Sequence, residues 1–102
     1  MYSIVKTEDF DKWLRKLKDQ RAKAKVLFRI QRIQEQGNFG DCQPVGHGLS
    51  ELRIHYAKGY RVYFKQKDEV IVLLLCGGTK STQEKDIMRA KELWTKFKSI
   101  LK

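Results

Sequence analysis

Two stretches in the middle of the chain, 49–56 and 60–66, alternate apolar and polar residues. Strict alternation is typical of half-buried β-strands, because successive side chains point to opposite faces of a sheet. The three residues between the stretches have the length of a hairpin turn. One face of this hairpin is expected to be apolar, with Leu52, Ile54, Tyr56, Val62 and Phe64. The other face is expected to be polar, with Glu51, Arg53, His55, Arg61, Tyr63 and Lys65.

Apolar residues at helical spacing flank the hairpin on both sides. Residues 10–17 and 20–36 repeat apolar positions every three or four residues, which predicts two amphipathic helices, with Thr7 as the cap of the first and Gly37 as the stop of the second. A third such pattern runs from 81 to 101, and Ser81 with Glu84 predicts a capping box at its start. Residues 2–6 predict a short first strand. Residues 38–48 hold three glycines and the only proline, which predicts a loop.

A nearly continuous apolar run at 69–76 predicts a central strand that is buried on both faces. Gly77 and Gly78 are expected to break this strand. The order of elements is therefore strand, two helices, three strands and helix. It predicts one α+β domain over 1–102 with a four-stranded sheet, and the first two helices should cover one face of that sheet.

Length and composition agree with one compact domain. The chain has 102 residues, of which 41% are apolar, so it can bury a core and is not expected to be disordered. Its two cysteines, Cys42 and Cys76, follow no spacing that signals a disulfide framework or a zinc site. No apolar run is long enough for a signal peptide or a membrane span, so we expect a soluble, cytoplasmic protein without a membrane partner.

The net charge of +10 favours a polyanionic partner. Most of the surplus lies outside the hairpin: the formal charge is +5 over 1–36, +1 over 37–78 and +4 over 79–102. A solvated helix surface also carries many lysines, so no single basic residue identifies an RNA contact. The total nevertheless makes nucleic acid the favoured partner.

Four side chains on the polar face of the hairpin are candidates for chemistry: Arg53, His55, Arg61 and Tyr63. Taken singly, each is compatible with an ordinary solvent-facing position. Together they bring two guanidinium groups, an imidazole and a phenol within reach across adjacent strands. Arginine binds phosphate through two hydrogen bonds, histidine titrates near neutral pH and tyrosine can stack on a base. Lys80 follows the glycine pair, and it should lie at the end of this face if the buried strand pairs with the hairpin.

The remaining motifs restrict the reaction that this face could catalyse. The sequence shows no carboxylate cluster for Mg²⁺ and no HExxH, GxSxG or Cys-His arrangement, so neither a metal nor another cofactor is expected. Asp41 and His47, in the loop, are expected to be surface groups. Cleavage of RNA by its own 2′-hydroxyl suits cationic residues and a proton donor, since the substrate supplies the nucleophile. Arg53, Arg61 and Lys80 would hold the phosphate, and His55 would transfer protons.

Four segments in order resemble the RelE/ParE toxin superfamily, and within it the phage-derived, HigB-like addiction module killer group. These segments are Glu-Leu-Arg-Ile-His-Tyr at 51–56, Gly-Tyr-Arg-Val-Tyr-Phe at 59–64, Leu-Leu-Leu-Cys-Gly-Gly-Thr-Lys at 73–80 and Thr-Gln-Glu-Lys-Asp-Ile at 82–87. The resemblance implies a RelE-like microbial RNase fold with a mainly antiparallel sheet. It also implies a toxin that cleaves mRNA on the ribosome without metal, leaving a 2′,3′-cyclic phosphate, and a helix-turn-helix, HigA-like antitoxin as partner.

The resemblance also suggests roles for single residues. Arg61 stands where the family has an arginine that stabilises the phosphate, while Arg53, His55 and Lys80 lie near other basic positions of the family. Predicted contacts to RNA or the ribosome are Lys58, Lys65, Gln83, Lys23, Lys25 and Arg29. RelE has a catalytic tyrosine near the start of its last helix, whereas residues 79–92 of this chain contain no tyrosine. His55 or Tyr63 would replace it in proton transfer, and Gln83 or Asp86 could assist. Two alternatives stay open: a ParE-like inhibitor of DNA gyrase, and a non-catalytic basic module that binds nucleic acid.

Overall fold

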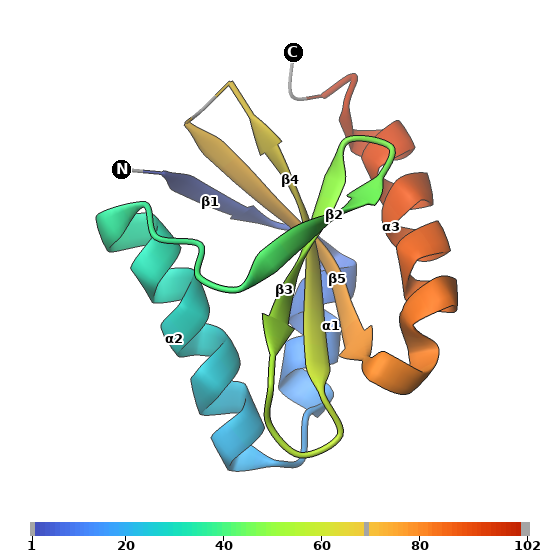
Figure 1. Ribbon diagram of the computed structural model, residues 1–102. Helices are drawn as coiled ribbons and strands as arrows, with labels where there is room; N and C mark the ends of the chain where they lie inside the picture. The colour runs from blue at the N-terminus through green and yellow to red at the C-terminus, as the bar shows by residue number, and fades with distance from the viewer. Residues whose placement is uncertain (1, 69, 101–102) are drawn as a thin grey trace.

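The computed structural model describes residues 2–68 and 70–100, which form three helices, five strands and one short 3₁₀ turn (Figure 1). Glu69 and Leu101, which the sequence pattern assigns to the buried strand and the last helix, lie outside the described residues. The elements in chain order are β1 (Ser3–Lys6), α1 (Glu8–Lys16), α2 (Gln20–Gln36), β2 (Cys42–Gly46), β3 (Leu49–Ile54), β4 (Tyr60–Lys67), β5 (Ile71–Thr79), η1 (Lys80–Thr82) and α3 (Gln83–Phe97). The predicted α+β class and the order of the other elements are confirmed, and β2 is the addition.

All five strands form one sheet in the order β1-β5-β4-β3-β2. β1 pairs with β5 in parallel, whereas every other pair is antiparallel, as expected from the resemblance. The prediction of four strands is wrong because part of the expected loop 38–48 pairs with β3 as β2. Pro44 lies within β2. An edge strand tolerates proline because half of its N–H groups have no partner strand.

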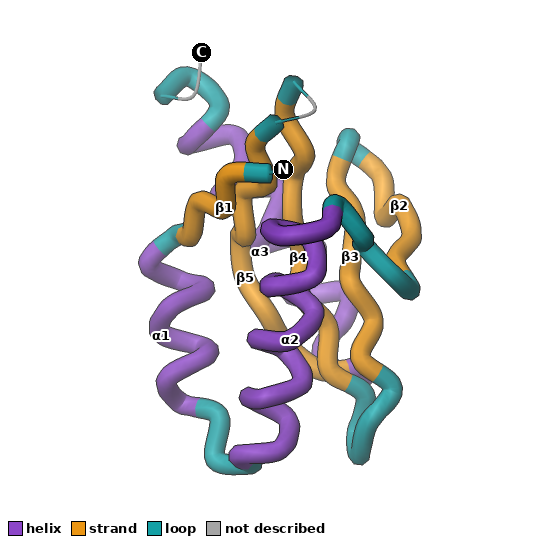
Figure 2. Tube along the Cα trace, turned by 90° about the vertical axis from the view of Figure 1, so that its left-hand side faces the viewer, coloured by secondary structure: helices purple, strands orange, loops and turns teal. Residues whose placement is uncertain are grey.

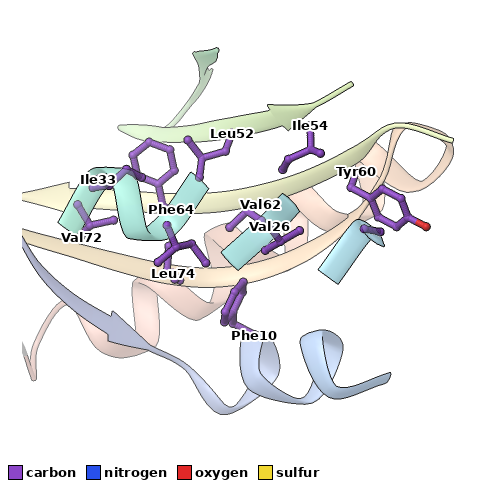
Figure 3. Close-up of a cluster of buried hydrophobic side chains, with 12 residues drawn as sticks. Phe10, Val26, Ile33, Leu52, Ile54, Tyr60, Val62, Phe64, Val72 and Leu74 are labelled. Atoms are coloured by element: carbon purple, nitrogen blue, oxygen red, sulfur yellow. The ribbon is translucent and has the colours of Figure 1, made fainter. Parts of the chain in front are cut away.

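Helices cover both faces of the sheet. Figure 2 shows α2 in front of the strands, α1 at their left and α3 behind them. The front layer packs apolar residues of both helices, among them Phe10, Val26 and Ile33, against one face of β3, β4 and β5 (Figure 3). The back layer packs Ala90 and Leu93 of α3 against the other face. β5 is therefore buried on both sides, as its apolar run predicts.

Local signals set the ends of the first two helices, and the predicted Thr7 cap and Gly37 stop are confirmed. The Thr7 hydroxyl accepts a hydrogen bond from the Phe10 N–H at 3.0 Å and caps α1. Asp19 caps α2 in the same way, and Gly37 ends it with a φ of 65°, a left-handed conformation that glycine adopts at low cost. No helix among residues 2–68 and 70–100 has both the length and the apolar character that a membrane crossing requires.

Two predictions about the end of β5 are wrong. Gly77 and Gly78 do not break the strand, which continues to Thr79. They are needed for close packing instead, because an added Cβ would lie 2.3 Å from the Trp13 ring at Gly77 and 1.8 Å from the Asp86 carboxylate at Gly78. The last helix also begins differently: the Thr79 N–H donates to the Thr82 hydroxyl, and α3 starts at Gln83 rather than at a Ser81 cap.

Candidate functional site

The candidate site lies at the end of the sheet where the β3–β4 turn meets the junction between β5 and α3, at the bottom of Figure 1. The Lys80 N–H donates to the Gly59 carbonyl at 2.8 Å and ties these two segments together. An open pocket of about 630 Å³ lies there. Four cationic side chains line it, together with Gln43, Glu51, His55 and Gln83: they are Arg53, Lys58, Arg61 and Lys80. The structure therefore brings together the predicted phosphate-binding residues of three separate segments.

Arg61 is held at the base of this pocket by a buried carboxylate. Its Nε lies 3.8 Å from Oε1 of Glu51, and the two residues are 7% and 0% exposed. Gln83 and Gln43 donate to the two oxygens of that carboxylate at 2.9 Å and 3.0 Å. Glu51 thus has three polar partners from three different segments. Nε of Arg61 has no hydrogen-bond partner among the described residues, so burial and the ion pair with Glu51 hold its guanidinium. A guanidinium held in this way is preorganised to bind an anion at little entropic cost.

A second carboxylate, that of Asp41, organises Arg53 and His55. Both Nε and Nη2 of Arg53 donate to Oδ1 of Asp41, at 3.2 Å and 2.8 Å, and Nε2 of His55 contacts the Oδ2 atom. The hydrogen bonds from Arg53 and then from His55 hold the pKa of the Asp41 carboxyl below its usual range. Asp41 is partly exposed and His47 is exposed, so both lie at the surface as expected, but Asp41 also organises two predicted site residues.

The helix α2 helps to hold Asp41 in place. The Arg29 guanidinium donates to the backbone carbonyls of Phe39, Asp41 and Arg53 at 2.6–2.9 Å. The Arg53 N–H also donates to the Asp41 carbonyl at 3.0 Å. Arg29, predicted as an RNA contact, therefore uses its hydrogen bonds to join α2 to the segment before β2. Arg29 therefore fixes the backbone around Asp41.

Tyr63 does not face the pocket, and the prediction of an exposed polar face is wrong at this position. Its side chain is 0% exposed because α3 covers this part of the sheet, and it packs with Leu73, Leu75 and Leu93. Burial raises the pKa of the Tyr63 phenol, and the nearby Glu51 carboxylate adds to the effect. A buried phenol with a raised pKa cannot reach a substrate in this arrangement.

Replacing Tyr63 by Phe is expected to raise the free energy of unfolding by about 1 kcal/mol. The Tyr63 hydroxyl has no hydrogen-bond partner among the described residues, and a buried unpaired hydroxyl destabilises the folded state. Urea unfolding followed by circular dichroism measures the change. A loss of stability of about 1 kcal/mol or more would show that this hydroxyl has a partner and would contradict the prediction.

The other predicted contacts divide between the pocket and distant surfaces. Lys58 and Gln83 line the pocket. Lys65 lies on β4, four residues after Arg61. Its Nζ donates to the Gly48 carbonyl and lies 5.4 Å from the centre of the Trp94 ring. Lys25 lies over the Tyr56 ring at 5.3 Å, and Lys23 is half-buried on α2. Lys23, Lys25 and Lys65 are thus absent from the residues that line the pocket.

Sequence patterns missed the two carboxylates and Gln43, which together hold the cationic groups. The alternation of β3 places Glu51 on the same face as Arg53. This alternation was the one sequence signal that could have identified Glu51 as part of the site. Its burial depends on α3, which the local pattern does not position. Asp41 lies outside the predicted strands, so nothing in its neighbourhood indicated a contact with His55, 14 residues away.

Cys76 should resist alkylation, although it lies on β5, the strand that precedes Lys80. Burial, reinforced by Asp86 and Asp9, raises the pKa of its thiol to about 12. Only about one thiol in ten thousand is then ionised at pH 8, and the thiolate is the reactive form. Iodoacetamide is expected to label Cys42, which is half-buried, long before Cys76, with the urea-unfolded protein as the control in which both react. Peptide mapping that finds Cys76 labelled first would contradict this.

Comparison with known proteins places this geometry in context. Residues 12–95 match the model of a family described as phage-derived protein Gp49-like. A Haemophilus influenzae protein described as uncharacterized is 58% identical over 90 residues, which cover 88% of this chain and 90% of that protein.

Two solved structures share the fold. A chain of the intact E. coli RelBE toxin–antitoxin complex matches with a TM-score of 0.64 at 20% identity, over 78% of this chain and 96% of that one. A mutant of the E. coli toxin RelE in the free state matches with a TM-score of 0.69 at 19% identity, over 89% and 96%. The RelE-like fold expected from the sequence motifs is therefore confirmed.

Proposed function

The chain belongs to the phage-derived Gp49-like family, and we propose that it is the toxin of a type II toxin–antitoxin pair that cleaves mRNA on the ribosome. The observation that carries the proposal is the pocket that Arg53, Lys58, Arg61 and Lys80 line around the buried Glu51 carboxylate, which Gln43 and Gln83 fix by hydrogen bonds. The RelE-like fold supports it. Four cations beside one buried carboxylate suit a dianionic phosphorane better than a neutral substrate.

In the proposed reaction, the 2′-oxygen of a ribose attacks the adjacent phosphorus and the bond to the 5′-oxygen breaks. A base takes the proton of the 2′-hydroxyl, and an acid gives a proton to the leaving 5′-oxygen. The products are a 2′,3′-cyclic phosphate and a 5′-hydroxyl. Arg61 and Lys80 hold the non-bridging oxygens, so their charge opposes the negative charge that develops on the phosphorane.

We assign the role of base to His55, which is well exposed and borders the pocket. The ionised Asp41 carboxylate accepts from Nε2–H of the ring, which leaves Nδ1 of the neutral imidazole as a proton acceptor. Asp41 is then a positioning residue, since it sets the tautomer and the orientation of His55 without touching the substrate. Gln83, fixed on Glu51, is available to hold the ribose or the phosphate.

The proposed partners are the translating ribosome, its mRNA and a neutralising antitoxin of the helix-turn-helix, HigA-like kind, all in the cytoplasm. One of the two solved structures that share the fold is a toxin–antitoxin complex, which supports an antitoxin partner for a chain of this fold. The net charge of +10 supports binding to ribosomal RNA and also to an acidic protein segment.

Induction of the chain in bacteria, followed by mapping of mRNA 5′ ends, tests the proposal. We expect growth arrest with new 5′-hydroxyl ends that keep a constant position within codons, and relief when a cognate helix-turn-helix antitoxin is expressed together with the chain. DNA breaks and a damage response with intact mRNA would indicate a gyrase inhibitor instead. Growth arrest with neither cleaved mRNA nor DNA breaks would contradict both mRNA cleavage and gyrase inhibition.

A further inference from the structure

A second hollow lies on the other side of the β3–β4 turn and opens between that turn and the end of α1. It encloses about 560 Å³ and is lined by Trp13, Lys16, Lys18, Lys58 and Tyr60, among other residues. Ala57 and Lys58 line both this hollow and the pocket of Arg61. In Figure 1 the link between α1 and α2, the β3–β4 turn and the junction of β5 with α3 all lie at the same end of the molecule. The two cavities are therefore neighbours across one turn.

Trp13 forms a rigid aromatic surface in this hollow, which we call the Trp13 hollow. Its ring lies against the backbone of β5 so closely that a Cβ at Gly77 would be 2.3 Å from the ring atom Cε3. Phe10 supports the ring from within the core, at a centroid distance of 5.8 Å. Tyr60, 3% exposed, lies at the end of the core cluster next to the turn (Figure 3). A ring fixed in this way loses little entropy when a ligand stacks on it.

The charges around the Trp13 hollow favour an anion beside the aromatic surface. Three lysines line it, and Lys16 and Lys18 come from the end of α1 and the segment after it. The one carboxylate in the lining, that of Asp19, accepts from the Arg21 and Ala22 N–H groups as the cap of α2. Its charge is therefore partly compensated by the helix N-terminus.

We propose that the Trp13 hollow binds the nucleotide next to the cleaved phosphate, with its base against Trp13 and its phosphate held by Lys16 and Lys58. Single-stranded RNA joins flat apolar bases to phosphates, which is the chemistry that an aromatic surface with flanking lysines recognises. An RNA strand that passes over the β3–β4 turn would occupy both cavities at once. This inference rests on the proposed function, since it extends the RNA site from the Arg61 pocket.

The two tryptophans of the chain allow a direct test. The Trp94→Phe protein reports on Trp13 alone, and the Trp13→Phe protein reports on Trp94, which lies on α3 beside Lys65. The purified full chain is titrated with a 2′-O-methyl RNA hexamer, which cannot be cleaved because its 2′-oxygen is blocked. We expect the fluorescence of Trp13 to fall as the hexamer binds and that of Trp94 to stay constant.

Lysine variants measure the phosphate contact in the same titration. Lys16→Ala is expected to lower the affinity for the hexamer about fivefold at about 0.1 M salt, as the loss of one phosphate contact predicts. Lys91→Ala, which removes the same charge from an exposed position on α3, should leave the affinity unchanged. If both variants lowered the affinity equally, net charge alone would explain the effect of Lys16, and the inference would be overturned. Binding without a change at Trp13, or no binding at low salt, would overturn it as well.

Cleavage assays on ribosomes separate this inference from the proposed function. If the Trp94→Phe protein cleaves mRNA while the hexamer leaves Trp13 fluorescence unchanged, the proposed RNA binding in the Trp13 hollow is wrong and the proposed nuclease activity is retained. If the hexamer quenches Trp13 fluorescence but no mRNA is cleaved, the Trp13 hollow binds RNA and the proposed nuclease activity is wrong.

Discussion

A protein in which Arg61→Ala is combined with Glu51→Gln is expected to fold, to bind its antitoxin and to lose mRNA cleavage by about 100- to 1000-fold. Arg61 is the cation fixed at the base of the pocket, and its loss removes a preorganised donor to the phosphorane. The second substitution is needed because Arg61→Ala alone would leave the buried Glu51 carboxylate without its paired guanidinium. Cleavage of a defined mRNA on purified ribosomes gives the rate.

Arg89→Ala is the matched control for this double variant. It also removes a guanidinium that is paired with a carboxylate, that of Asp9 at 2.9 Å, but it lies on α3, outside the Arg61 pocket. We expect this control to cleave at the rate of the unmodified protein. Full cleavage by a folded Arg61→Ala, Glu51→Gln protein would remove Arg61 from the mechanism.

The second large effect concerns stability. Arg61→Ala alone is expected to lower the free energy of unfolding by about 3 kcal/mol, because a buried carboxylate loses its partner. The figure is at the low end of the usual range, since Arg53 also lies close enough to interact with Glu51. Adding Glu51→Gln should recover most of the loss, as a neutral amide can still bond with Gln43 and Gln83.

Urea unfolding of the single and double variants measures this coupling between Arg61 and Glu51. The prediction requires the double variant to be more stable than Arg61→Ala alone, even though it carries one more substitution. If the two variants unfold at the same urea concentration, the Glu51 charge is not compensated by Arg61. The packing of both side chains would then explain the loss of stability.

The alternation of residues 49–56 and 60–66 was sufficient to predict β3, β4 and the face on which each side chain lies. The registers Arg53↔Arg61 and Glu51↔Tyr63 follow from a short hairpin. What alternation could not supply is the layer above each face. The apolar stripe of α3 covers the half of the polar face that holds Tyr63, so one predicted site residue became a core residue.

Glycine and proline were misleading for a related reason. Gly77 and Gly78 signal a break when only the neighbouring sequence is considered, yet they stay in β5 because Trp13 and Asp86 approach the backbone there. Pro44 argues for a loop, yet an edge strand accepts it. In both cases a tertiary contact decides the structure, and no local pattern contains that contact.

The parts of the candidate site were predicted better than their connections. Arg53, His55 and Arg61 were identified by residue type and strand phase, and Lys80 by its place after the glycine pair; the pocket gathers all four. Their partners Glu51 and Asp41 were not, because a carboxylate that is distant in sequence or covered by a helix leaves no periodic signal. These carboxylates hold Arg53, His55 and Arg61 in a fixed geometry.

The central claim is that the Arg61 pocket cleaves mRNA through its 2′-hydroxyl, and identification of the reaction products tests it most directly. Ribosomes carrying a defined mRNA with an open A site are incubated with the purified protein, and the cut ends are identified by mass spectrometry. We predict one main cut, with a 2′,3′-cyclic phosphate on one fragment and a 5′-hydroxyl on the other, and no cut when a 2′-deoxy nucleotide replaces the attacking ribose. Intact mRNA, or equal cleavage of the 2′-deoxy substrate, would contradict it.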